Sequence, residues 1–109
     1  MSLDQLQAVV TIAEEGTIVR AARLLHISQP PLTRKLRALE DELGVELFDR
    51  GARGMRPTLA GQAFVASARG ILAAVDEAAA TVRAAATSGP PDPRARRLEG
   101  GRGSGRSRA

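Results

Sequence analysis

The chain has no cysteine, tryptophan or tyrosine, and only two phenylalanines and one histidine among its 109 residues. Without cysteine it forms neither disulfides nor thiolate metal sites, and His26 has no second histidine with which to share a metal ion. The scarcity of aromatic rings argues against binding of single-stranded nucleic acid, which depends on base stacking. We therefore expect no metal ion and no other cofactor.

A long apolar run is also missing. The longest uncharged stretch, residues 57–68, is too short and too rich in alanine to span a bilayer. The N-terminus carries Asp4 and lacks the basic segment of a secretory signal. We expect no membrane partner and a cytoplasmic location.

Charge is unevenly distributed along the chain. The net charge is +4, and this excess lies in residues 87–109, because residues 1–86 hold equal numbers of acidic and basic side chains. Residues 16–39 contain no acid, residues 40–49 contain no base, and residues 50–56 contain only basic charges. Such segregation suits a protein that presents one surface to DNA.

Residues 17–37, TIVRAARLLHISQPPLTRKLR, have the pattern of two short helices joined by a tight turn. Ala21 and Ala22 allow the helices to cross closely, and every charge in the segment is basic. An apolar stripe at helical spacing follows, made of Leu32, Leu36, Leu39 and Leu43. The pattern predicts a helix-turn-helix, whose second helix lies in the major groove of DNA.

Capping residues set the expected helix boundaries. We expect helices over residues 3–15 and 18–25, and a recognition helix that Ser28 caps and Gly44 ends. Three apolar residues should close the turn before this third helix: Leu24, Leu25 and Ile27.

Two short strands, residues 45–48 and 55–57, are expected to form a wing, and a long helix should follow over residues 59–86. Residues 87–109 are rich in Gly, Pro, Ser and Arg and should be disordered, because they have too little apolar material to offset the entropy of folding. The expected division is thus residues 1–58, residues 59–86 and the tail.

The stretches SQPPLTR and LEDELGVELFDR, followed by a Gly- and Arg-rich turn and a TLAG helix start, resemble the N-terminal winged helix-turn-helix of LysR-type transcriptional regulators. The resemblance covers about residues 2–86. It implies a mainly α fold, with three helices and a short β-hairpin wing followed by a long linker helix. Family members carry a ligand-sensing domain after that helix. Nothing in this chain resembles that domain, so no small-molecule inducer site is expected here.

Candidate DNA contacts lie on the outer N-terminal part of the recognition helix and on the wing, where the alternative is a solvated polar surface. Gln suits adenine, Arg suits guanine, and a Thr methyl suits thymine. The expected base contacts are Gln29, Pro30, Thr33 and Arg34. The expected backbone or wing contacts are Ser28, Lys35, Arg37, Arg50, Arg53 and Arg56. The alternative for Arg50 is a pairing with an acid that holds the wing.

Apolar or small residues recur at heptad spacing along the long helix: Phe64, Ala68, Ile71, Val75, Ala78 and Val82. A helix of this length has more apolar stripe than so small a body can cover, and in the resembled family the linker helix pairs with its counterpart. We expect a homodimer through these residues. The alternative is that the stripe packs back on the helix-turn-helix core.

No enzymatic activity is expected, because no nucleophile or phosphate-binding loop accompanies the acidic residues 40–42. The sequence favours a regulator of the LysR type that binds specific double-stranded DNA sequences at the nucleoid, truncated and without the inducer-binding domain. The alternative is a truncated interaction protein that heterodimerises with full-length LysR-type subunits.

Overall fold

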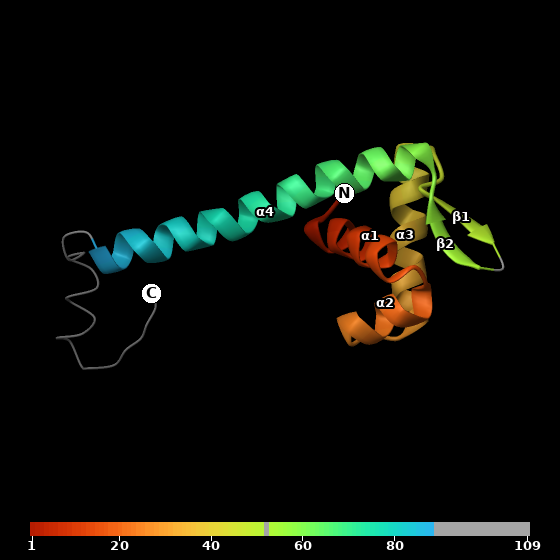
Figure 1. Cartoon of the computed structure of the whole chain (residues 1–109), viewed down its shortest axis with the longest axis horizontal. Coiled ribbons are helices and arrows are strands. Elements are labelled where there is room, and N and C mark those ends of the chain that lie inside the picture. The colour runs from red at the N-terminus through yellow and green to blue at the C-terminus, as the bar shows by residue number, and fades with distance from the viewer. Residues whose placement is uncertain (52, 89–109) are drawn as a thin grey trace. The chain divides into compact units, whose positions relative to one another are not determined.

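The computed structural model describes residues 1–51 and 53–88. In this part of the chain it contains four helices and one hairpin (Figure 1). They are α1 (Leu3–Glu15), α2 (Ile18–Leu25), α3 (Gln29–Leu43), β1 (Phe48–Gly51), β2 (Gly54–Pro57) and α4 (Leu59–Ser88). The expected fold class, mainly α with a hairpin wing and a long final helix, is confirmed. The chain divides between Ala74 and Val75 into two compact units, and α4 contributes to both.

The first two helices begin where their capping residues predict. The Ser2 hydroxyl accepts a hydrogen bond from the Gln5 N–H at 3.2 Å, and the Gln5 side chain accepts one from the Ser2 N–H at 2.9 Å. Thr17 caps α2 in the same way through the Arg20 N–H at 3.1 Å. Gly16, with φ at 83°, ends α1 in the left-handed region that glycine favours.

Ser28 occupies the N-cap position of α3 but makes no capping hydrogen bond. An N-cap side chain accepts from the N–H of the second or third helical residue. In α3 these residues are Pro30 and Pro31, which have no N–H. The expected helix start is therefore right, while the exposed Ser28 hydroxyl is left available for an external group.

The core of the unit formed by residues 1–74 takes apolar side chains from all four helices. Its largest fully buried members are Phe48, Ile12, Leu32, Leu36, Leu39, Leu47 and Val9. Two leucines expected inside lie outside, since Leu43 is 37% exposed and Leu24 is 56% exposed. Leu43 is the last residue of α3, and the buried Leu47 supplies the next core side chain. Leu24 points away because Ala21 and Ala22 already form the inner face of the short α2 helix.

The wing is an antiparallel hairpin in which Phe48 pairs with Pro57 and Gly51 pairs with Gly54. The first strand begins later than expected: β1 starts only at Phe48, so the predicted range of residues 45–48 is wrong. The backbone groups of the two preceding residues, Glu46 and Leu47, form hydrogen bonds with side chains outside the hairpin. The Leu47 N–H donates to the Glu40 carboxylate at 2.7 Å, and the Glu46 carbonyl accepts from the Thr58 hydroxyl at 2.8 Å.

The start of α4 is tied to the segment before the hairpin. The Thr58 hydroxyl accepts from the Gly61 N–H at 3.0 Å, and the Thr58 N–H donates to the Leu47 carbonyl at 3.0 Å. A side chain at Gly61 would collide with that same carbonyl. The helix ends at Ser88, two residues beyond the expected Ala86. Of the predicted disordered tail, residues 89–109 lie outside the described residues.

The first turns of α4 pack on the core of their own chain. Val65 is 6% exposed and Ala68 is 1% exposed, and the half-buried Phe64 and Leu72 pack against the same core. The prediction that Ala68 contacts a partner is therefore wrong, because the Ala68 side chain is buried within its own chain. Phe64 also packs on this core while part of its side chain stays exposed, so its contact with a partner stays a prediction. For this part of the helix the alternative of packing back on the core is correct.

Candidate nucleic-acid interface

The outer face of α3 lies opposite the buried stripe of Leu32, Leu36 and Leu39. At about 100° per residue, Arg34 falls near the middle of that face, while Thr33 and Lys35 fall toward its two edges. Burial agrees with this geometry, since Arg34 is exposed and both of its neighbours are half-buried.

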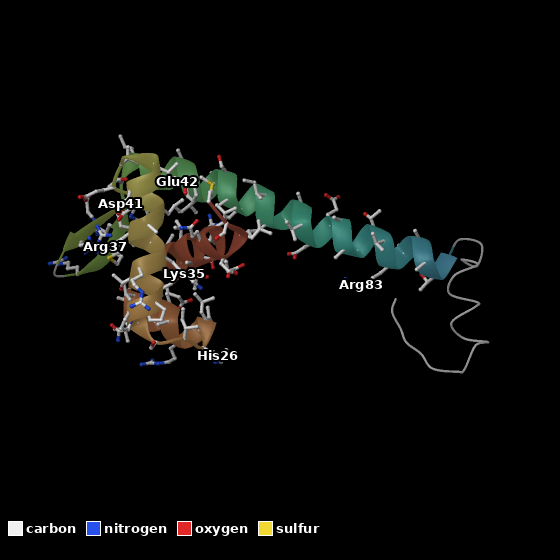
Figure 2. The ribbon with its side chains drawn as sticks, turned by 180° about the vertical axis from the view of Figure 1, so that it is seen from behind. His26, Lys35, Arg37, Asp41, Glu42 and Arg83 are labelled. Carbon is white, nitrogen blue, oxygen red and sulfur yellow. The ribbon has the colours of Figure 1, made fainter. Side chains whose placement is uncertain are left out.

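The basic side chains of this face are unpaired within the described part of the chain. No salt bridge is found for Arg34, Lys35 or Arg37 there. Figure 2 shows Lys35 and Arg37 along α3, with Asp41 and Glu42 nearer its C-terminal end. Free cations therefore precede the acids along the helix, which suits contact with phosphates at its N-terminal half.

One edge of this face borders a depression beside the start of α1. Pro31, Arg34, Lys35 and Ala38 line it from α3, and its volume is about 520 Å³. Met1, Ser2, Asp4 and Gln5 complete it. The half-buried Lys35 thus faces α1 as well as solvent, which makes it less available to a base edge than the exposed Arg34.

The wing is held against the turn between α1 and α2. The Met55 N–H donates to the Gly16 carbonyl at 2.9 Å. Gly54 has φ at 110°, and a Cβ there would lie 2.5 Å from the Gly16 carbonyl oxygen, so only glycine fits. Arg53 and Arg56 are exposed and form no salt bridge with any described residue.

Arg50 behaves differently from the other wing arginines. Its guanidinium lies 2.7 Å from the Glu40 carboxylate, and its side chain is 29% exposed. Glu40 is buried, and its second carboxylate oxygen accepts the Leu47 N–H at 2.7 Å. The alternative given for Arg50, a pairing with an acid that holds the wing, is therefore what the structure shows.

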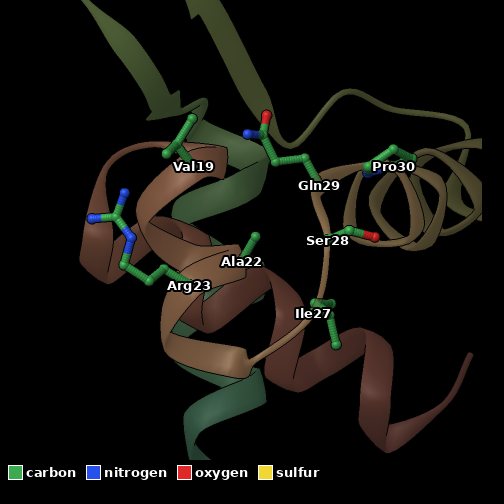
Figure 3. A pocket seen from close by; sticks show the side chains of 7 residues that line it. All are labelled: Val19, Ala22, Arg23, Ile27, Ser28, Gln29 and Pro30. Atoms are coloured by element: carbon green, nitrogen blue, oxygen red, sulfur yellow. The ribbon is translucent and has the colours of Figure 1, made fainter.

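Two residues that the sequence did not single out lie beside the expected base contacts. Val19 and Arg23, one turn apart on α2, line a depression with Ser28, Gln29 and Pro30 (Figure 3). Ala22 and Ile27 complete its lining. Figure 3 shows the Val19 side chain and the Gln29 amide directed to the same side, while the Arg23 side chain extends from α2 away from Gln29. The sequence carries no signal for Val19, because Ile18 and Leu25, apolar residues of the same short helix, pack against the core.

Metal and membrane sites are not found in the described part of the chain. Within residues 1–51 and 53–88, no group of three or more His, Asp or Glu side chains is arranged to hold a metal ion. No helix among these residues is long and apolar enough to cross a membrane.

The model of the bacterial regulatory helix-turn-helix proteins of the lysR family matches residues 3–62, which include α1, α2, α3, the hairpin and the first turn of α4. The chain belongs to the LysR family. The matched region holds every α3 and wing arginine described above, so the candidate interface lies within the region that matches the family.

Individual LysR-family regulators resemble this chain over the same region. The transcriptional regulator TfdS of Cupriavidus pinatubonensis is 56% identical over 72 residues, which are 66% of this chain and 24% of TfdS. The small neutral protease regulatory protein of Streptomyces coelicolor is 46% identical over 92 residues, or 84% of this chain and 29% of that protein. The chain therefore spans about a quarter of the length of such relatives.

Solved structures of LysR-family DNA-binding domains share the fold. The CbnR domain in complex with DNA is 45% identical, with a TM-score of 0.74 over 79% of this chain and 99% of that one. The BenM domain in complex with catB site 1 DNA is 38% identical, with a TM-score of 0.78 over 83% and 100% of the two chains. Both of those domains were solved on DNA.

Proposed function

We propose that this chain binds specific sequences of double-stranded DNA and regulates transcription, with α3 in the major groove and the hairpin beside it. The observation that carries the proposal is the set of exposed, unpaired cations on one helix face and on the wing. Two relatives with the same fold that were solved on DNA support it. We propose no catalytic role, and the relatives named above are regulators.

Individual residues have distinct proposed roles. Base edges would be read by Gln29, Pro30, Thr33 and Arg34, which begin α3 or lie on its outer half. Phosphates or the minor groove would be contacted by Ser28, Lys35, Arg37, Arg53 and Arg56. The free Ser28 hydroxyl supports its role, because no capping bond competes for it. Arg50 is proposed to hold the wing rather than to bind DNA.

Dimerisation through α4 is the second part of the proposal. Ile71 is 45% exposed, Val75 is 43% exposed and Val82 is 67% exposed, and Ala78 is exposed as well. Full burial of a large apolar side chain is worth about 1.5–3 kcal/mol, and the exposed fraction of each of these side chains leaves part of that free energy to be gained in a dimer. A symmetric homodimer would recognise a pseudo-palindrome with half-sites about one helical turn, or a multiple of it, apart.

In this scheme residues 1–58 form the DNA-binding domain, and the helix over residues 59–86 joins the DNA-binding domains of two subunits. Because Val65 and Ala68 belong to the core, the folded DNA-binding domain also includes the first turns of α4. The regulator is favoured over a subunit-capturing interaction protein, since the relatives named are themselves regulators.

The proposal is tested by selecting binding sites for the full chain from randomised duplexes. We expect enrichment of a pseudo-palindromic site and, for that duplex, an affinity at least about a thousandfold above that for unrelated DNA at physiological salt. Fluorescence anisotropy against the same sequence as a single strand is the control. No enriched site, or equal affinity for both forms of the DNA, would reject the proposal.

A further inference from the structure

The depression between α2 and the start of α3 contains groups that the roles proposed above do not use. Val19 and Arg23 form its α2 side, Gln29 and Pro30 form its α3 side, and its volume is about 560 Å³. It therefore opens beside the residues proposed to read bases.

Val19 offers this depression an apolar surface. Its side chain is 45% exposed, and it lies on the same side as the Gln29 amide in Figure 3. The exposed Pro30 lines the same depression from α3. Among the groups that base pairs present in the major groove, the thymine C5 methyl is the apolar one. An apolar wall beside a base-reading amide thus selects for that methyl group.

Arg23 offers the same depression a cation. It is exposed and forms no salt bridge within the described residues, whereas Arg20 on the same helix lies 3.6 Å from the Glu15 carboxylate. In helix-turn-helix docking the first helix of the motif crosses the DNA backbone. An unpaired guanidinium at that position is suited to a phosphate of the strand entering the groove.

We infer that this depression is a thymine-reading subsite, in which Val19 and Pro30 contact the methyl group of a thymine next to the base read by Gln29, and Arg23 holds an adjoining phosphate. The inference rests on the proposed DNA binding and adds two α2 residues with separate tasks. Val19 affects which base is preferred, while Arg23 contributes equally to all sequences.

The test replaces thymines by deoxyuridine, which pairs like thymine but lacks the methyl group. In the site selected for the full chain, each thymine of one half-site is replaced in turn, and affinity is measured by fluorescence anisotropy. We expect one position per half-site at which the loss of the methyl group weakens binding about fourfold, as expected for one buried methyl-sized group. The other thymines should change affinity less than about twofold.

Variants then assign the methyl contact. With Val19→Ala the deoxyuridine penalty at that position should fall to about twofold or less, because only the Pro30 contact with the methyl group remains. The matched control is Val45→Ala, since Val45 is equally exposed at 45% but lies outside the depression. Val45→Ala should keep the full penalty. Each penalty compares two duplexes on the same variant, so a change in folding does not affect it.

Arg23 is tested by salt dependence. Arg23→Gln should weaken binding to all duplexes alike and reduce the slope of log affinity against log salt by about 0.9 per subunit. Arg83→Gln, which removes the same charge from an exposed position on α4, should leave the slope nearly unchanged.

The outcomes separate this inference from the function on which it rests. If a site is selected but no thymine is sensitive to its methyl group, or Val19→Ala retains the penalty, the thymine subsite is wrong while DNA binding stands. An unchanged slope for Arg23→Gln would overturn the phosphate contact. If no site is selected, the proposed function fails and the subsite fails with it.

Discussion

Glu40 on α3 and Arg50 on β1 form an ion pair of 2.7 Å across the segment that joins the recognition helix to the wing. The other carboxylate oxygen of Glu40 binds the Leu47 N–H. One buried side chain thus fixes both the path of the chain after α3 and an arginine of the first wing strand. This carboxylate and the bond between the Met55 N–H and the Gly16 carbonyl both hold the wing in place.

Removing that carboxylate should destabilise the fold. Glu40→Ala leaves the Leu47 N–H without its acceptor and Arg50 without its partner, and we expect a loss of about 1–3 kcal/mol in the free energy of unfolding. Urea denaturation followed by circular dichroism measures it. Asp41→Ala, at an exposed neighbouring position, should change stability by about 0.5 kcal/mol or less. Equal effects of the two variants would show that the Glu40 contacts are dispensable.

The junction of α4 gives a second stability prediction with a control on the same helix. Gly61→Ala would push a methyl group into the Leu47 carbonyl, and overpacking of this kind costs about 1–3 kcal/mol. A Cβ at Gly70 would have no neighbour within 4 Å, so Gly70→Ala should raise stability by up to about 1 kcal/mol. Thermal unfolding compares the two, and the same sign of change for both would contradict the packing described.

Arg34 should be the strongest single contributor to base preference. It lies near the middle of the outer face of α3 and forms no salt bridge with any described residue. Arg34→Ala should cost about 1–3 kcal/mol of binding free energy and relax the preference at one position of each half-site. Site selection with the variant is the measurement, and Arg83→Ala is the control for net charge. An unchanged base preference would reject the role of Arg34.

The α4 seam, made of Ile71, Val75, Ala78 and Val82, is tested by introducing carboxylates. Ile71→Asp with Val75→Asp should separate the subunits, because burying two charges per chain in an apolar seam is costly. Sedimentation should report a monomer of near-native helix content, with affinity for the selected site reduced toward that for unrelated DNA.

The control for the seam is Ala66→Asp with Ala73→Asp. Both residues are exposed on α4 and lie on the opposite side of the helix at about 100° per residue. This variant should remain a dimer. A seam variant that stays dimeric, or a wild-type chain that is monomeric at micromolar concentration, would rule out the α4 interface.

The helices are predictable from the sequence because local chemistry sets their ends. The hydroxyls of Ser2 and Thr17 cap two helix starts, and Gly16 and Gly44 end helices in the left-handed region. Each of these signals acts within a few residues of the helix end. The start of the first strand is not predictable in this way, because the Glu40 carboxylate takes the Leu47 N–H. Pattern alone cannot reveal such a bond across seven positions.

The apolar periodicity of α4 does not predict what the apolar face of the helix contacts. A heptad describes which residues share a face, and the same face can meet either a second subunit or the body of the same chain. Ala68 meets its own core, whereas Ile71, one turn later, remains 45% exposed. Where along α4 the core ends follows from tertiary packing, which the spacing of apolar residues does not encode. The exposure of Val19, on which its proposed contact with DNA depends, follows from tertiary packing for the same reason.

The contact of the wing with Gly16 ties the wing to the turn between α1 and α2. Because the Met55 N–H bonds to the Gly16 carbonyl at 2.9 Å, the separation between the wing and the start of α2 is fixed within the domain. A DNA-binding domain in which this distance is fixed fits best on a duplex whose groove spacing matches it. DNA whose grooves differ from that distance must deform, at a free-energy cost that depends on its stiffness. Sequence preference should then extend to base pairs that no side chain touches, where flexibility rather than base identity is selected.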